Sequence, residues 1–483
     1  MTPPVPPQRL SPQDAIFLHL EGPNTPYHVA SLLIFERGEI DVPAIESLML
    51  SRLHLVPRLR QKLATPPLGQ GRPVWVDDEH FDIRYHVRVA TVPPPSTERE
   101  LLEMCSGFME QHLSRSRPLW EVYVIDGLEG DRAAIFAKTH HCMVDGVSGI
   151  DVAALLLDDA GVGAGSTEAV QARPEWAPRR APSKRELLMD AVREEIRTPG
   201  AALGAVGKLV RRPRKLLATV GEDLAGAADL ARAAMHPVPS GPLNVRIGPN
   251  RRLDIVRSRL DVFKAIKDTL GGTVNDVVLC AVTGALREWL LSRGEKVEGL
   301  ELAAMVPVSI RGEDEVGIGN RVSTIVAPLP VGERDPAERY RLVREGTQRA
   351  KSSHQVVGAD LLLQVSGFMP PALVAQIARI QNAQRVFNLS ITNIVGPAEP
   401  LYAAGHRLLD LFPFTPLAGN MTLIIAVVSY AGRMEFGLTA DAESLPDLDV
   451  ITSALERSID GLLGLAGLSE GDLAIRALRA IAE

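Results

Sequence analysis

A change of composition near the middle of the chain divides the sequence into two parts. Residues 161–182 are rich in Gly, Ala, Pro and Ser, and three prolines (Pro174, Pro178 and Pro182) interrupt any regular element there. Short β-rich runs alternate with amphipathic helical patterns on both sides of this stretch. The alternation predicts two α/β halves joined by an exposed linker. No short-period repeat is present, so a solenoid or a propeller is not supported.

The domain boundaries follow from these breaks. We expect an N-terminal domain over residues 1–160, a linker and helical crossover over residues 161–240, and a C-terminal domain over residues 241–483. Within the crossover, Ser183 and Glu186 have the spacing of a capping box, which predicts a helix start, with further helix to about Met235. Four prolines between residues 236 and 249 mark the second boundary.

Individual elements are predicted on both sides of the linker. In the first half, residues 29–35 read as a strand and residues 42–55 as a helix. In the second half, residues 273–291 have a helical period, and three short, apolar, β-branched runs read as buried strands: residues 302–308, 322–329 and 421–428.

Composition excludes several classes of protein. With 483 residues, 46% of them hydrophobic, and a formal net charge of −7, the chain is globular and has no general attraction for nucleic acid. Its three cysteines (Cys105, Cys142 and Cys280) form no CxxC pair, which favours a reducing compartment. The proline-rich first 14 residues lack the charged and apolar regions of a secretion signal, and no run of about 18 apolar residues occurs. We therefore expect a cytoplasmic protein without a membrane-spanning helix.

The strongest local signal is a pair of histidines at the end of a predicted strand. Residues 133–139 are strand-like and lead into His140-His-Cys-Met-Val-Asp145-Gly146, after which residues 150–157 have helical propensity. Asp-Gly favours a turn, and loops placed in this way on a rigid scaffold often carry function. A histidine can accept a proton near neutral pH, and a nearby carboxylate can orient it or bind a cation.

Other interpretations of this segment remain open at this point. Two adjacent histidines are often surface residues or satisfied core residues. A metal site is not expected, because neighbouring residues on a strand point to opposite faces and His140 and His141 would hardly bind one ion together. Cys142 could be a nucleophile, but adjacency in sequence does not create the geometry that activates a thiol, so we interpret Cys142 as structural.

The segment His-His-x-x-x-Asp-Gly resembles the signature of the acyltransferase superfamily that includes chloramphenicol acetyltransferase-like enzymes and peptide-synthetase condensation domains. Further segments resemble the bacterial wax ester synthase/acyl-CoA:diacylglycerol acyltransferase family, and they span nearly the whole chain apart from the linker. They are Leu10-Ser-Pro-Gln-Asp-Ala15, Pro118-Leu-Trp-Glu121, Asn275-Asp276, Val306-Pro-Val-Ser-Ile-Arg311, Gly319-Asn320 and Asn393-Ile-Val-Gly-Pro397. Val395 departs from the proline that the family often has in the last segment.

The resemblance implies a fold and a set of roles. The fold would be two chloramphenicol acetyltransferase-like α/β domains with mixed sheets and an active-site channel between them. His141 would be the general base and His140 a supporting residue. Asp145 would be structural, holding its loop through an arginine, for which Arg311 is the candidate. Gly146 would allow the backbone to approach the substrate closely, or it is simply a turn glycine.

Two further motif residues have two interpretations each. Asn275 and Asp276 match a family motif at the start of a predicted helix, where they could support the channel or bind substrate. Equally, such residues cap helices, and Thr273 is another candidate cap. The segment Pro118-Leu119-Trp120 is interpreted as packing near the channel rather than as catalytic.

The function implied by the resemblance is transfer of a long-chain acyl group from acyl-CoA to the hydroxyl of diacylglycerol or of a fatty alcohol. Acyl-CoA would be a substrate, and no cofactor and no metal are expected. One alternative is a related acyltransferase that takes its donor from a carrier protein. Another alternative, from a different class, is a catalytically silent lipid-binding protein. A functional assay has to separate the three.

A basic segment in the crossover bears on where such a protein would act. Residues 208–215 carry five positive charges among apolar residues, so they could contact anionic headgroups at a membrane or lipid-droplet surface. A solvated linker helix is the more common interpretation of such a composition. CoA phosphates are a third candidate partner of this segment, although no Gly-rich phosphate-binding loop marks a site for them.

Overall fold

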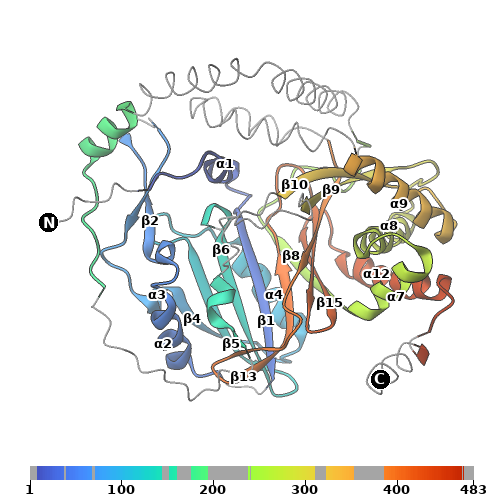
Figure 1. Ribbon diagram of the computed structural model, residues 1–483, viewed down its shortest axis with the longest axis horizontal. Helices are drawn as coiled ribbons and strands as arrows, with labels where there is room; N and C mark the ends of the chain where they lie inside the picture. The colour runs from blue at the N-terminus through green and yellow to red at the C-terminus, as the bar shows by residue number, and fades with distance from the viewer. Residues whose placement is uncertain are drawn as a thin grey trace, which may run out of the picture.

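Two large β-sheets with helices packed against them make up most of the structure (Figure 1). The computed structural model describes residues 8–36, 40–67, 71–143, 152–159, 176–193, 238–239, 241–309, 322–352, 386–469 and 471–472. Both halves are α/β, and each sheet mixes parallel and antiparallel pairs. The predicted fold class is therefore confirmed.

The first sheet has seven strands, and most of them come from the N-terminal half. Its order is β4 (Val87–Thr91), β5 (Trp120–Leu128), β6 (Arg132–His140), β1 (His28–Glu36), β13 (His406–Phe414), β12 (Leu401–Ala403) and β7 (Asp158–Asp159). A separate two-stranded sheet pairs β2 (Gln61–Ala64) with β3 (Val74–Asp77). On one face of the first sheet lie α1 (Pro12–Leu20) and α2 (Val42–Arg52), and on the other lies α4 (Glu98–Glu110).

The central pairing of this sheet crosses the division drawn from the sequence. β1 pairs with β6 on one side and with β13, from the C-terminal half, on the other. Both edges of β1 are therefore satisfied, and its apolar run is buried between two layers. The domain limits 1–160, 161–240 and 241–483 stay a prediction, although β13 follows residue 241 and belongs to the first sheet. Local patterns say nothing about such a long-range pairing.

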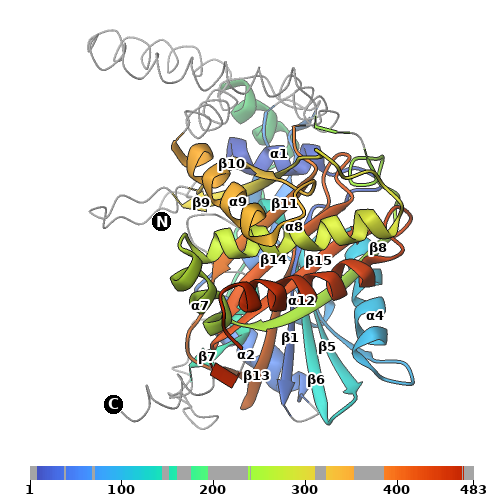
Figure 2. The same ribbon diagram turned by 90° about the vertical axis from the view of Figure 1, so that its right-hand side faces the viewer.

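The second sheet has six strands and lies beside the first. Its order is β10 (Val322–Leu329), β9 (Leu302–Ser309), β11 (Leu389–Val395), β14 (Leu423–Tyr430), β15 (Arg433–Asp441) and β8 (Arg251–Arg259). Figure 2 shows the helices that cover its outer face: α7 (Leu260–Leu270), α8 (Val274–Ser292), α9 (Pro336–Ser352) and α12 (Leu448–Leu465). The largest apolar core lies between these helices and the sheet.

A sharp bend separates α7 from α8. Gly271 and Gly272 have φ of 78° and 90°, a backbone conformation that glycine adopts without a steric penalty. In the described part of the chain, no single helix is long and apolar enough to cross a membrane. The two helices α7 and α8 meet that test only as a pair, by length and composition, and they are bent by 98°.

Most local predictions are confirmed by the described residues. The expected strands at residues 29–35, 302–308, 322–329 and 421–428 are β1, β9, β10 and β14, and the expected helices at residues 42–55 and 273–291 are α2 and α8. Ser183 and Glu186 form both hydrogen bonds of the capping box, and a helix runs over residues 184–193. The segments 161–175, 194–237 and 208–215 lie outside the described residues.

Residues 150–157 were expected to be helical, and this expectation needs a correction. Of this segment the structure describes residues 152–157, and Val152–Leu156 form a 3₁₀ helix, η4, rather than an α-helix. Two further 3₁₀ turns are η1 (Pro57–Arg60) and η3 (His141–Met143), and α3 (Ile83–His86) is a single helical turn. Short helical segments often take the 3₁₀ form, because its i→i+3 hydrogen bonds close with fewer residues than those of an α-helix.

Helix α4 joins the two halves along the open edge of β8 (Figure 2). Ser106 Oγ accepts the backbone N–H of Leu253 (3.0 Å), and Glu110 Oε1 accepts that of Arg251 (2.8 Å). Ser106 and Glu110, four residues apart on the helix, thus lie beside Leu253 and Arg251, which are two residues apart on the strand. The side chains of α4 satisfy edge groups that would otherwise be free to pair with another chain.

Candidate active site

The two histidines lie where β6 ends and turns away from the sheet. His140 is the last residue of β6, opposite His28 on β1, and its backbone N–H bonds to the carbonyl of Leu119 (2.9 Å). His141 begins the turn η3, and its backbone N–H donates to the carbonyl of Tyr27 (2.9 Å). Sheet pairing therefore fixes the backbone on which both imidazoles are placed.

His140 is buried, with 1% of its surface exposed. Its Nδ1 accepts the backbone N–H of Cys142 (3.1 Å). Burial lowers the pKa of this imidazole to about 4, although the Glu21 carboxylate works in the opposite direction. The ring is then neutral at pH 7, and its proton is on Nε2, because Nδ1 is used as an acceptor. His140 thus holds the chain before His141 through its own backbone N–H and after His141 through Nδ1.

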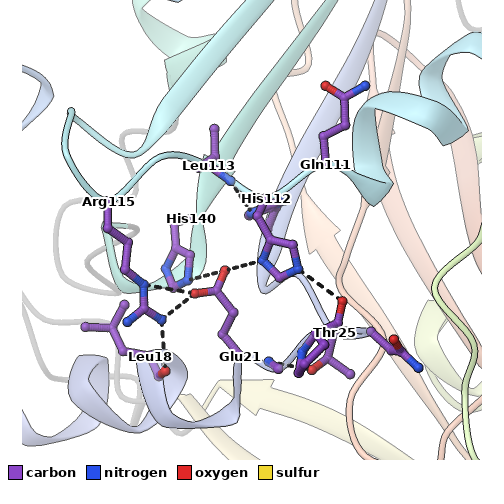
Figure 3. Close-up of polar contacts among 12 residues, drawn as sticks. Leu18, Glu21, Thr25, Gln111, His112, Leu113, Arg115 and His140 are labelled. Atoms are coloured by element: carbon purple, nitrogen blue, oxygen red, sulfur yellow. Dashed lines mark hydrogen bonds and ion pairs between the residues drawn. The ribbon is translucent and has the colours of Figure 1, made fainter.

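Glu21, the residue that follows α1, faces the free edge of the His140 ring (Figure 3). Its Oε1 lies 3.7 Å from His140 Nε2, which is longer than a direct hydrogen bond, and 3.1 Å from His112 Nδ1. Arg115 donates to Oε2 from Nε (3.2 Å) and from a terminal nitrogen. Burial would raise the pKa of Glu21, but the hydrogen bond from Arg115 and the neighbouring positive charges lower it overall. The carboxylate is therefore negative beside the proton of His140.

A second set of buried groups lies behind this carboxylate. His28 is fully buried, and its Nε2 accepts the backbone N–H of Leu113 (3.4 Å). Burial, together with the charge of Lys138, holds the pKa of His28 well below its ordinary value. Lys138, two residues before His140 on β6, donates from Nζ to the carbonyls of Phe108 (2.9 Å) and Gln111 (3.0 Å) at the end of α4. It also lies 3.3 Å from Glu121 Oε2.

His141 has different surroundings from His140. It is partly exposed, and its ring lies against Phe17 of α1, with ring centroids 4.0 Å apart, and near Tyr27, at 5.9 Å. Burial lowers the pKa of the imidazole, while an interaction with its own backbone opposes this shift. The ring is therefore neutral at physiological pH and can accept a proton. Of the two histidines, His141 is the one that is both neutral and accessible to solvent.

The thiol next to the histidines has no sign of activation. Cys142 is buried as a free cysteine, and burial raises its pKa above the ordinary value of a thiol. A neutral thiol is a poor nucleophile, and Cys142 packs in the apolar core of the first sheet. Among the described residues, no group of three or more His, Cys, Asp or Glu side chains could hold a metal ion.

Comparison with known proteins decides the family. Residues 10–278 match the wax ester synthase/diacylglycerol acyltransferase catalytic domain, and residues 318–462 match the C-terminal domain of the same family. The chain belongs to this family. It is 32% identical to the O-acyltransferase WSD of Acinetobacter baylyi, over 95% of this chain and 98% of that protein. It is also 32% identical to a probable diacylglycerol O-acyltransferase of Mycobacterium tuberculosis, over 95% and 99% of the two chains.

Solved structures of similar shape agree with the family assignment. The wax ester synthase/diacylglycerol acyltransferase from Marinobacter aquaeolei VT8 is 27% identical, with a TM-score of 0.67, over 95% of this chain and all of that one. The starter condensation domain of rhizomide synthetase is only 15% identical, with a TM-score of 0.53, over 95% and 94% of the two chains. This second likeness concerns the fold alone, and it confirms the predicted condensation-domain-like architecture.

The family motif on α8 lies in the helix layer of the second sheet. Thr273 and Asp276 form a capping box, and Asp276 Oδ1 also accepts the hydroxyl of Thr347 on α9 (2.6 Å). Asp276 thus acts as a helix-capping residue. Asn275 is partly buried and makes no hydrogen bond to another residue in the described part of the chain, so its role as channel support stays a prediction. No hydrogen bond or ion pair between described residues joins either side chain to His140 or His141.

The remaining site residues expected from the resemblance cannot be placed. Asp145, Gly146 and Arg311 lie outside the described residues, and so does the proposed pairing of Asp145 with Arg311. Trp120 is fully buried, and its indole N–H donates to the carbonyl of Leu59 (2.8 Å), as its interpretation as a packing residue requires.

Several residues around the histidines were not anticipated from the sequence. Glu21 lies 119 residues before His140, and no spacing rule links the two. The only available signal was indirect, because Glu21 closely follows the motif Leu10–Ala15. Phe17 and Tyr27 carry no chemical signal as single aromatic residues. Their positions become informative only once β1 and β6 are paired.

Proposed function

We propose that this protein transfers a long-chain acyl group from acyl-CoA to the hydroxyl of diacylglycerol, and also of a fatty alcohol. The products are triacylglycerol and wax ester. Membership of the wax ester synthase/diacylglycerol acyltransferase family supports this reaction, and so do the names of the relatives, which describe O-acyltransferases. Acyl-CoA is a substrate in this proposal, and no bound cofactor is required.

The observation that carries the proposal is the difference between the two histidines. His140 is buried and its Nδ1 is engaged with the backbone of Cys142, whereas His141 is partly exposed and neutral. A general base needs access to the acceptor and an unprotonated nitrogen. Nδ1 of His141 is buried and makes no hydrogen bond to another described residue, so Nε2 is the atom assigned to the acceptor hydroxyl.

The reaction needs no acyl-enzyme, because a thioester is already activated. His141 Nε2 takes the hydroxyl proton as the alcohol oxygen attacks the thioester carbon. The tetrahedral intermediate collapses, the C–S bond breaks, and the proton passes from His141 to the CoA sulfur. Positioning of the two substrates and base catalysis are the contributions required of the protein, and the base contributes about 10²–10⁴-fold.

The supporting roles follow from the same assignment. His140 holds the turn, and the negative carboxylate of Glu21 orients the Nε2–H of His140. Asp145, Gly146 and Arg311 keep the structural roles that the resemblance assigns, and Asn275 supports the channel. Diacylglycerol is a lipid, so the protein must meet a lipid surface at least transiently. We assign this contact to the basic residues 208–215, and flotation with anionic vesicles tests it.

The test uses purified full-length protein with radiolabelled palmitoyl-CoA. Dioleoylglycerol, hexadecanol and no acceptor are compared, and palmitoylated carrier protein replaces palmitoyl-CoA in a parallel series. His141→Ala should lose about 100-fold or more in ester formation without a change in the melting temperature. His80→Ala, which removes an exposed histidine, is the matched control and should retain full activity.

Three outcomes contradict the proposal in different ways. Undiminished turnover in His141→Ala removes the base assignment. Binding of acyl-CoA without any ester product identifies a silent lipid-binding protein. Preference for the acylated carrier protein changes the donor but leaves the role of His141 intact.

A further inference from the structure

One ring of an aromatic pair covers the imidazole of His141. Phe17 lies with its ring centroid 4.0 Å from that of His141, at an interplanar angle of 36°. Tyr27 stacks on Phe17 at 5.6 Å and 22°, and lies 5.9 Å from His141. We call Phe17 and Tyr27 the aromatic wall. The wall stands on one side of the imidazole, and nothing in the proposed proton transfer uses it.

The position of Phe17 is fixed by its neighbours on α1. Ala15 and Leu18 are buried in the same apolar core as Cys142 and Met143 of the histidine turn. The carbonyl of Leu18 also accepts a hydrogen bond from Arg115 (3.3 Å), which itself binds Glu21. Helix α1 is therefore held on both sides of Phe17. The contact between the two rings follows from this packing and not from a loose side chain.

The base alone does not determine which hydroxyl, that of a lipid or that of water, is deprotonated. An imidazole that deprotonates an alcohol can also deprotonate water, and attack by water on the thioester would give a fatty acid and free CoA. In that reaction the C–S bond breaks, a C–O bond forms, and the water proton passes through His141 to the CoA sulfur. The selection of a lipid hydroxyl over water must therefore come from groups that surround the imidazole.

We propose that Phe17 is a positioning residue that holds the His141 ring and excludes water from the face it covers, and so determines that a long-chain hydroxyl is acylated in preference to water. The inference rests on the proposed function, because it takes His141 as the base. An apolar ring offers water no hydrogen bond, while it packs against an acyl or alkyl chain. The same contact contributes to the burial that lowers the pKa of His141.

Phe17 rather than Tyr27 is assigned this role for two reasons. Phe17 is closer to the imidazole and is partly exposed, so its ring can meet a ligand, whereas Tyr27 is 8% exposed. The backbone carbonyl of Tyr27 also holds the His141 N–H, so substitution there would mix two effects. Phe17 contacts His141 through its side chain, while its backbone carbonyl accepts the N–H of Glu21 (3.2 Å).

The experiment measures how each acyl group is partitioned. Full-length protein is supplied with radiolabelled palmitoyl-CoA and dioleoylglycerol, and the ratio of triacylglycerol to free palmitate is determined for the natural protein, Phe17→Ala and Phe17→Leu. Phe17→Ala should lower this ratio by about ten-fold or more, and Phe17→Leu, which keeps apolar bulk, should lower it less. The acid limb of the pH–rate profile should also move upward in Phe17→Ala, because the pKa of His141 returns toward its ordinary value.

A matched control separates this role from stability. Phe81 is also partly exposed and stacks on a histidine, His86, with centroids 5.3 Å apart, but among the described residues it makes no ring contact with His141. Phe81→Ala should lower the melting temperature without changing the ratio of ester to acid. If Phe17→Ala misfolds, Phe17→Leu still has to show the lowered ratio. An unchanged ratio in every folded Phe17 variant overturns the inference.

Failure of the proposed function has a different signature. If His141→Ala keeps both ester formation and palmitate release, the base assignment is wrong whatever Phe17 does. If His141→Ala loses both reactions while the Phe17 variants keep the natural ratio, only the role of Phe17 is wrong.

Discussion

His140 accepts, through Nδ1, the hydrogen bond of the Cys142 backbone N–H, and so spans the residue that is assigned as the base. In the proposed mechanism, the buried histidine therefore acts on the backbone of Cys142 and not on the substrate. This explains how two adjacent imidazoles can have different roles although both are neutral at pH 7.

Substitution of His140 tests this clamp. His140→Ala removes the acceptor and should lower kcat by about 100-fold through misplacement of His141. His140→Asn should recover a large part of this loss, because an Asn side chain can accept the N–H two residues further on. Steady-state kinetics on both variants gives the comparison. Equal activity of the two variants would show that the acceptor at position 140 is irrelevant.

The pH dependence of activity should reflect the environment of His141. Its pKa is lowered by burial, so the base becomes protonated only below the ordinary histidine value of about 6.5. Activity should therefore persist as the pH falls through 6.5 and decline at a lower value. A profile of kcat/KM from about pH 5 to about pH 8 measures this limb. An acid limb above the ordinary value would contradict the assignment.

Glu21→Gln should make the protein less stable in a pH-dependent way. The folded-state pKa of Glu21 is lowered, so its contribution is present above the ordinary value of 4.5 and is lost as the pH falls through the lower folded value. At pH 7 we expect a loss of about 1.5–3 kcal/mol, as for hydrogen bonds to a charged group. Urea unfolding at several pH values measures the difference from the natural protein, which should shrink toward acid pH.

The control for Glu21 is an exposed carboxylate in a local pair. Glu103 pairs with Arg99 on α4, and its side chain is 66% exposed. Glu103→Gln should change the free energy of unfolding little at any pH, because exposed pairs contribute little. If the loss of unfolding free energy in Glu21→Gln stays constant from neutral to acid pH, the charged form of Glu21 is not what stabilises the protein.

Lys138→Met should be strongly destabilising. The ammonium is fully buried, and its loss leaves two carbonyls at the end of α4 without their donor and removes one partner of Glu121. Breaking a buried pair typically costs about 3–5 kcal/mol. A double-mutant cycle with Glu121→Gln, followed by chemical denaturation, isolates the pair. Additive effects would show that Lys138 acts through the helix end alone.

A fragment of residues 1–160 should not fold as an independent unit. It lacks β13, so one whole edge of β1 loses its hydrogen-bonding partner and becomes free to aggregate. We expect the fragment to lack a cooperative unfolding transition and to associate in sedimentation experiments. The full-length chain, in which β13 pairs with β1, should unfold cooperatively and should not associate through this edge. A monomeric fragment with a cooperative transition would establish residues 1–160 as an autonomous domain.

Prediction from the sequence succeeded where the signal is local. Short, apolar, β-branched runs located β9, β10 and β14, and the spacing of Ser183 and Glu186 gave the helix start. The strand-to-turn pattern identified the histidine pair and the resemblance implied its roles, but neither spacing nor composition could show that His140 is buried beside Glu21. The placement of β13 in the first sheet was missed for the same reason, because pairings between distant segments leave no trace in local periodicity.

The strand that pairs with one edge of β1 is synthesised late. β13 begins about 370 residues after β1 ends. At synthesis rates of about 5–20 residues per second, the first strand waits roughly 20 to 75 s for it. During that time, β6 and β1, which place the histidines, belong to a sheet that lacks β13. Activity should therefore appear only after nearly the whole chain has left the ribosome, and chaperones that shield unpaired strands should raise the yield of active protein.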